Sequence, residues 1–237
     1  MIFYYIRHGD PIYDPDSLTP LGERQAEAVA KRLSVYGLDE IYASTSNRAI
    51  LTATPTSEIL KKEIKLVDFA NEGHAYGEFT LTENGHRHWV YQNRRLVELF
   101  NTKEIRNLGD EWFNHEAFGR TKCRQGVERI YRESDAFFKE LGYEHIPYTG
   151  QYKVIKSNPK RIGMFAHHGF GMAFLSAILD IPYPMMVSHF NMSHSAVTII
   201  NFEEENGIAI PMVYSLSNDS HLYKEGLPTN YNNILRI

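Results

Sequence analysis

The residues with the clearest chemical potential stand in four short groups, spread from the N-terminus to the last third of the chain. They supply two arginines, three histidines and one carboxylate: Arg7, His8, Arg48, Glu72, His167 and His168. Arginine holds a phosphate dianion by bidentate hydrogen bonds, which its planar guanidinium makes better than lysine. A neutral histidine has a lone pair that can attack phosphorus near neutral pH. Two arginines can neutralise the equatorial phosphate oxygens without a metal, so this set predicts phosphoryl-transfer chemistry.

Each group follows a segment whose pattern predicts a buried strand. The short apolar runs that we interpret as strands cover residues 2–6, 38–44, 64–69 and 161–166. Helical patterns at 19–33, which Thr19-Pro20 opens, and at 48–62 separate the first three runs. This alternation predicts an α/β fold, a three-layer α/β/α sandwich around a mostly parallel sheet. Ligands of such sheets bind beyond the carboxyl ends of the strands, so the four groups should converge on one edge.

The pattern changes after the third strand. Residues from Gly73 to about Asn158 are mixed in type, and helical periodicity is clearest from Val127 to Leu141. We interpret residues 73–158 as a largely helical cap inserted into a single domain of residues 1–237. The strand at 161–166 should lead through a small-residue turn at 169–171 into a helix at 172–179. Strands at 196–202 and 210–216 should form a closing hairpin.

Composition narrows the function classes. The 237 residues carry a net charge of −4, which disfavours a general nucleic-acid binder. The single cysteine, Cys123, excludes an internal disulfide and fits a reducing cytoplasm. No segment reads as a signal peptide or a membrane span. Eleven histidines suggest metal binding, but the pair His86-x-His88 lacks further ligands nearby, so no metal site is expected.

In this order, the motifs resemble the histidine phosphatase superfamily, the phosphoglycerate mutase-like group. The resemblance rests on Arg7-His8-Gly9, Leu18-Thr19-Pro20-Leu21-Gly22 with Gln25, Ser44-x-x-x-Arg48-Ala49-x-x-Thr52-Ala53, Glu72 and Ala166-His167. It implies a phosphohistidine intermediate on His8, and a phosphate pocket made of Arg7, Arg48 and a second histidine. It also implies Glu72 as proton donor, a small phosphorylated metabolite as substrate, and no metal or organic cofactor.

Two positions have alternatives. The register of the late strand favours His167 as the second histidine, whereas a motif with histidine directly before glycine selects His168. Glu72 is the expected proton donor, but Glu78 and Glu83 follow closely in the sequence.

The mutase branch usually has tryptophan-asparagine after its first motif and arginines around the later glutamate. Here Asp10-Pro11-Ile12-Tyr13 and Asn71-Glu72-Gly73 stand at those places. A hydrolase of the histidine acid phosphatase type, a phosphomonoesterase, is therefore favoured. The alternatives are a phosphoglycerate mutase-type phosphotransferase and an inactive phosphometabolite-binding regulatory protein. The sequence is compatible with a monomer and with a homodimer.

Overall fold

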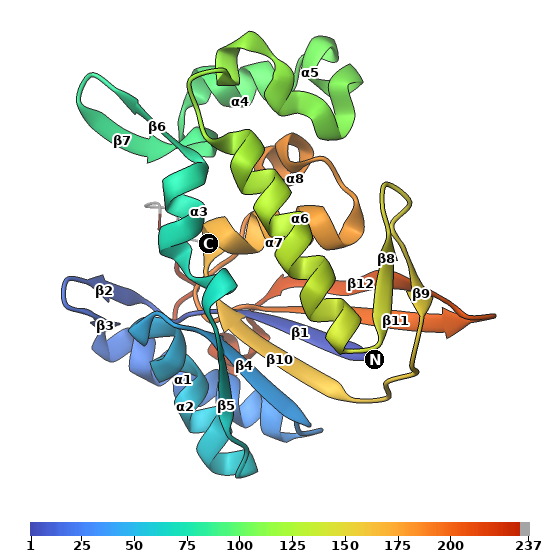
Figure 1. Ribbon diagram of the computed structural model, residues 1–237. Helices are drawn as coiled ribbons and strands as arrows, with labels where there is room; N and C mark the ends of the chain where they lie inside the picture. Colours follow the sequence, from blue (N-terminus) through green and yellow to red (C-terminus); the bar gives the residue numbers. More distant parts are fainter. Residues whose placement is uncertain (233–237) are drawn as a thin grey trace.

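An eight-stranded mixed sheet lies at the centre of the computed structural model, which describes residues 1–232 (Figure 1). Its strands follow the order β5 (Ile64–Val67), β4 (Glu40–Ser44), β10 (Arg161–Ala166), β1 (Ile2–Arg7), β11 (Val197–Glu205), β12 (Ile208–Asn218), β9 (Gln151–Val154) and β8 (Tyr143–Ile146). The first four strands are parallel, and the pairs from β1 to β8 are antiparallel. The carboxyl ends of β5, β4, β10 and β1 therefore meet at one edge.

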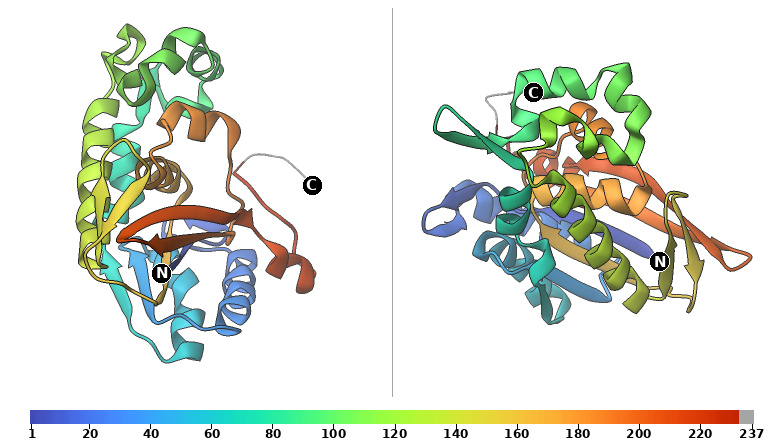
Figure 2. Two further views of the ribbon diagram at one scale, coloured as in Figure 1. Left: turned by 90° about the vertical axis from the view of Figure 1, so that its right-hand side faces the viewer. Right: turned by 45° about the horizontal axis from the view of Figure 1, so that its top comes forward.

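Helices cover both faces of this sheet (Figures 1 and 2). One face packs against α1 (Pro20–Ser34) and α2 (Asn47–Leu60), and the other against α6 (Cys123–Glu140) and α7 (His168–Leu179). Alternate residues of β1 supply the two cores, because successive side chains of a strand point to opposite faces. Phe3 and Tyr5 join the core under α6 and α7, whereas Ile6 joins the core over α1 and α2.

The remaining elements lie either between β5 and α6 or in three other parts of the chain. Those between β5 and α6 are α3 (Glu72–Glu78), β6 (Thr80–Glu83), β7 (His86–Trp89), α4 (Arg94–Phe100) and α5 (Lys103–Leu108), with 3₁₀ turns at 68–70, 90–92, 109–114 and 116–118. Four lie outside that stretch: β2 (Pro11–Tyr13) and β3 (Asp16–Leu18), which pair as a hairpin, α8 (Tyr183–His189) and α9 (Ser220–Lys224). The β2–β3 and β6–β7 hairpins extend from the same side of the molecule (Figure 1). Within residues 1–232, no helix is both long and apolar enough to span a bilayer.

The predicted α/β class is confirmed, with a sheet whose parallel half holds the four expected strands. The turn predicted at 169–171 is wrong, because α7 already begins at His168. Its glycines serve close packing instead: a Cβ at Gly171 would lie 2.6 Å from the Tyr5 hydroxyl. Residues 143–154, placed in the cap by their mixed pattern, form β8 and β9 at the edge of the sheet. The cap boundaries as a domain division stay a prediction.

A buried histidine fastens β8 to the helical layer. His145 contacts the carboxylate of Asp135 on α6 at 2.9 Å and that of Asp180, at the end of α7, at 3.1 Å. Burial alone would lower the pKa of His145, but the hydrogen bonds to both carboxylates outweigh it and raise that pKa to about 9. The imidazolium therefore stabilises the fold across the neutral range.

We expect His145→Gln to destabilise the protein by about 2–3 kcal/mol at pH 6. The pKa in the folded state is above the unfolded value of 6.5, so this contribution is complete below about pH 6.5 and disappears as pH rises through about 9. Urea unfolding of both proteins from pH 6 to about pH 10 measures the difference. His74→Gln, at an exposed partner of Asp68, is the control. If the difference in unfolding free energy between wild type and His145→Gln did not decrease with rising pH, the stabilising role of the charged imidazole would be contradicted.

Candidate active site

The loop that follows β1 is fixed by contacts with two helices. The backbone N–H of Gly9 donates to Thr52 Oγ1 at 3.0 Å, and that of Asp10 donates to Gln25 Oε1 at 2.7 Å. Gly9 also approaches Gly22 so closely that a Cβ on Gly9 would lie 2.6 Å from the Gly22 carbonyl oxygen. The motif residues of α1 and α2 thus hold the segment that carries His8.

His8 is buried and its ring has a defined tautomer. Its Nδ1 lies 2.7 Å from the carbonyl oxygen of Gly9, which can only accept, so Nδ1 carries the proton and Nε2 keeps a lone pair. Burial lowers the pKa of His8 well below 6.5, and His167, Arg7 and Arg48 lower it further. The side chain is therefore a neutral imidazole with a nucleophilic nitrogen.

Both predicted arginines are buried beside His8. Arg7, at the end of β1, donates from Nη1 to the carbonyl of Met192 and from Nη2 to Oδ1 of Asn232. Arg48, near the start of α2, donates from Nη1 to Asp16 at 2.7 Å. The Nε atom of each guanidinium is buried without a hydrogen-bond partner among residues 1–232. Both arginines thus keep a donor for an oxyanion.

The two consecutive histidines occupy different places. The His167 ring lies 5.2 Å from the His8 ring, between centroids, and its Nε2 is 2.8 Å from Ser44 Oγ. Ser44 Oγ accepts from the N–H of Ser46, so its O–H can donate to His167 Nε2, which places the proton on Nδ1. That Nδ1 is buried and has no partner within residues 1–232. His168 lies beside Tyr91, with 3.1 Å between Nδ1 and the hydroxyl.

Of Glu72, Glu78 and Glu83, Glu72 lines the same pocket as Arg7, His8 and Arg48. Its Oε1 accepts from the N–H of Gly169 at 3.0 Å and its Oε2 from that of Phe170 at 2.9 Å. Burial raises the pKa of Glu72 above 4.5, although these hydrogen bonds and the arginines oppose the shift. Glu78 pairs with Arg129, and Glu83 pairs with Arg95.

These groups line one open pocket of about 580 Å³. Five of the six predicted side chains line it directly: Arg7, His8, Arg48, Glu72 and His168. His167 lies behind them, in contact with His8. The structure therefore brings all the predicted site residues together at the edge where the parallel strands end. Among residues 1–232, no three His, Cys, Asp or Glu side chains are grouped so as to hold a metal ion.

Residues 3–98 match the sequence profile of the histidine phosphatase superfamily (branch 1). The predicted resemblance is confirmed. Solved structures with a similar fold match nearly the whole chain. A mutant phosphoserine phosphatase from Entamoeba histolytica, in complex with phosphoserine, has a TM-score of 0.60 at 19% identity, covering 93% of this chain and 98% of the other. No curated protein matches the sequence significantly.

A mycobacterial glucosyl-3-phosphoglycerate phosphatase with inorganic phosphate gives a similar result. Its TM-score is 0.59 at 15% identity, with 93% of this chain and 98% of the other covered. At such identities the likeness establishes the shared fold. The function of this chain has to be argued from its own residues.

Three residues near His8 and the arginines lie outside the superfamily motifs quoted from the sequence; two of them, Tyr13 and Asn232, line the pocket. The His194 ring stacks on the His8 ring with 5.9 Å between the centroids, and His194 Nε2 lies 2.8 Å from Asn232 Oδ1. Asn232 Oδ1 also accepts a hydrogen bond from Arg7. The Arg48 guanidinium lies over the ring of Tyr13, in the β2–β3 hairpin, with its central carbon 5.5 Å from the ring centroid. All three come from segments without a periodic pattern. The one sequence feature that marks His194 is its place between two serines, Ser193 and Ser195.

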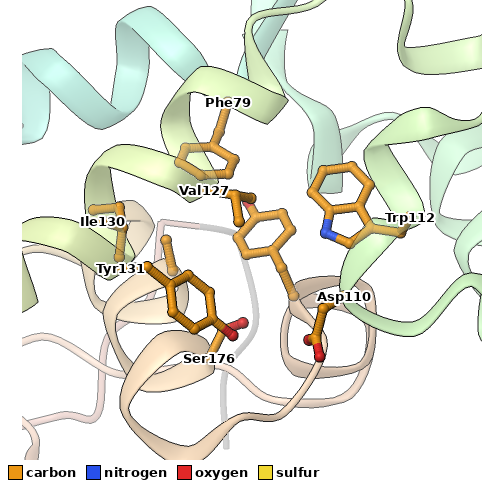
Figure 3. A pocket seen from close by; sticks show the side chains of 9 residues that line it. Phe79, Asp110, Trp112, Val127, Ile130, Tyr131 and Ser176 are labelled. Atoms are coloured by element: carbon orange, nitrogen blue, oxygen red, sulfur yellow. The ribbon is translucent and has the colours of Figure 1, made fainter. Parts of the chain in front are cut away.

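A second cavity lies between α6, α7 and the 109–114 turn, apart from the superfamily motifs (Figure 3). Mostly aromatic and aliphatic side chains surround it (Figure 3). Its polar groups are the Asp110 carboxylate, the indole N–H of Trp112 and the hydroxyls of Tyr131, Ser176 and Tyr183. Its volume is about 10 Å³, close to that of one water molecule. This cavity cannot admit a metabolite. The 580 Å³ pocket is the candidate substrate site because the predicted site residues line it.

Proposed function

We propose that this chain is a phosphomonoesterase that hydrolyses a small phosphorylated metabolite through a covalent phosphohistidine on His8. The observation that carries the proposal is the state of His8. It is a buried neutral imidazole, its Nδ1 is tied to the Gly9 carbonyl, and two guanidinium groups with unused donors lie beside it. This arrangement supplies both a nucleophile and charge neutralisation for a phosphoryl group.

In the first step, His8 Nε2 attacks phosphorus in line with the ester oxygen. The N–P bond forms as the P–O bond to the leaving group breaks, and protonated Glu72 gives its proton to the leaving oxygen. Arg7 and Arg48 neutralise the equatorial oxygens through their free Nε–H groups. His167 donates from Nδ1, so we assign it as the inner phosphate ligand and place His168 on the outer wall.

In the second step, water attacks the phosphohistidine. The Glu72 carboxylate takes a proton from that water, the N–P bond breaks, and inorganic phosphate leaves with His8 restored as the neutral imidazole. Glu72 thus acts first as acid and then as base, a task suited to a carboxyl whose pKa is raised by burial. No step in this sequence needs a metal.

Hydrolysis of p-nitrophenyl phosphate in the presence of a chelator tests this function directly. The proposal expects release of inorganic phosphate at an undiminished rate after chelation. Activity that requires an added divalent cation would contradict the metal-free mechanism. Transfer of the phosphoryl group between positions of phosphoglycerate would support the mutase alternative. Tight binding of phosphometabolites without turnover would support a regulatory role.

The depressed pKa of His8 predicts activity on the acid side of neutrality, in keeping with an acid phosphatase-type enzyme. Protonation removes the attacking lone pair, so kcat/KM falls as pH drops below the pKa of His8. Burial, His167 and the two arginines lower that pKa well below 6.5, so the fall should begin well below pH 6.5. A pH profile with p-nitrophenyl phosphate, corrected for substrate ionisation, measures it. Half-loss of activity near pH 6.5 would contradict a depressed pKa.

A cytoplasmic location and a homodimer stay predictions from the sequence.

A further inference from the structure

The pocket extends well beyond the phosphate-binding groups. Its 580 Å³ is in the range of sites that enclose whole metabolites. The groups that would hold phosphate come from the ends of β1, β4 and β10, whereas the β6–β7 hairpin and the 90–92 turn line the outer part. The outer part therefore has to recognise the rest of the substrate.

A continuous aromatic wall links the inner and outer parts. The ring centroids of His168 and Tyr91 are 5.3 Å apart, and those of Tyr91 and Trp89, which stack, are 5.4 Å apart. Trp89 in turn packs edge-on against Tyr76, with 5.4 Å between the centroids. All four side chains line the pocket. Aromatic faces of this kind bind planar rings and the apolar faces of sugars. The wall leads outward from His168 to the hairpin.

Arg87 stands at the outer end of this wall. Its guanidinium lies over the Tyr76 ring at 4.7 Å, and it donates to Thr80 Oγ1 at 2.6 Å and to the Tyr76 carbonyl at 2.9 Å. These acceptors are neutral, and within residues 1–232 Arg87 has no carboxylate partner. Other cap arginines do, since Arg95 pairs with Glu83 and Arg129 with Glu78. Arg87 is thus an oriented cation whose charge is not balanced.

We propose that the substrate is a phosphomonoester with a ring next to the ester and a second anionic group at its far end. The ring lies along Tyr76, Trp89 and Tyr91, and Arg87 binds the distal carboxylate or phosphate. This inference rests on the proposed phosphatase function and names its substrate class. A guanidinium already fixed by hydrogen bonds loses little entropy when it binds an anion, which makes Arg87 a specificity-determining residue.

The test compares two aryl phosphates that differ only at the para position, 4-carboxyphenyl phosphate and its neutral 4-carbamoyl analogue. We expect kcat/KM to favour the carboxylate by about three- to fivefold at low ionic strength, as for one charge-assisted contact at an exposed arginine. The carbamoyl group withdraws electrons more strongly, so leaving-group chemistry alone favours the amide. High salt should reduce the ratio. A wild-type ratio of one or less would overturn the inference without any variant.

Variants test whether Arg87 causes the preference for the carboxylate compound. Arg87→Gln should bring the ratio close to one, and Arg87→Lys should give an intermediate ratio because it keeps the charge but not the planar donor set. Arg94→Gln is the matched control, since Arg94 is an exposed cap arginine that pairs with Glu98 and does not line the pocket. An unchanged ratio in Arg87→Gln would overturn the assignment. If neither compound nor p-nitrophenyl phosphate is hydrolysed, the proposed function itself fails.

Discussion

Replacing His8 with alanine should abolish phosphomonoester hydrolysis, with kcat reduced by at least about 10³-fold. The expected loss is large because the variant lacks the nitrogen that accepts the phosphoryl group, and no other side chain takes its place. His167 is the nearest imidazole, but its Nε2 contacts Ser44 and its Nδ1 carries a proton in the arrangement described. The measurement is single-turnover and steady-state phosphate release.

The control for this loss is substrate binding. Arg7, Arg48 and Glu72 remain in His8→Ala, so the variant should still bind an intact phosphomonoester, which calorimetry can measure. Loss of turnover with retained binding assigns His8 to the chemical step. Hydrolysis at the wild-type rate in His8→Ala would show that another group attacks phosphorus.

Replacing Glu72 with glutamine should lower kcat/KM by about 10²–10³-fold for an alkyl phosphate such as glycerol 2-phosphate. The loss should be less than about tenfold for p-nitrophenyl phosphate, because nitrophenolate leaves without needing a proton. The difference between the substrates separates proton donation from a structural role. Glu72 also accepts two backbone hydrogen bonds at the start of α7, and their loss would reduce both rates equally.

Glu83→Gln is the matched control for this prediction. Glu83 is a cap glutamate that pairs with Arg95 and does not line the substrate pocket. Its replacement should leave both rates close to wild type. If Glu83→Gln reproduced the dependence on the leaving group, the proton donor would be Glu83 rather than Glu72.

The inner half of the site could be predicted from the sequence because each residue follows a strand of a parallel array. The apolar runs before Arg7 and His167 are recognisable as buried strands, and parallel strands place their carboxyl ends at one edge. The sequence did not settle the choice between His167 and His168. Adjacent residues at a helix start point in different directions, and only the contact with His8 distinguishes them.

The outer half of the site could not be predicted, for two physical reasons. Arg87 and Trp89 belong to a short hairpin whose two strands have four residues each and are mostly polar, so no run of alternating apolar residues marks them. Asn232 and His194 reach Arg7 and His8 through tertiary contacts between distant segments, which no local pattern encodes. The strands β8 and β9 were missed because each has only four residues, too few to show a clear strand pattern in the sequence.

The most direct test of the account is to trap the phosphorylated enzyme. The protein is mixed with a phosphomonoester labelled with radioactive phosphorus, quenched in alkali within the first turnover, digested and mapped by mass spectrometry. We expect one phosphoryl group on His8, stable in alkali and lost in acid like other phosphoramidates, and absent from His8→Ala. A phosphoryl group on another residue, or phosphate release with no phosphorylated His8 at any time, would contradict it.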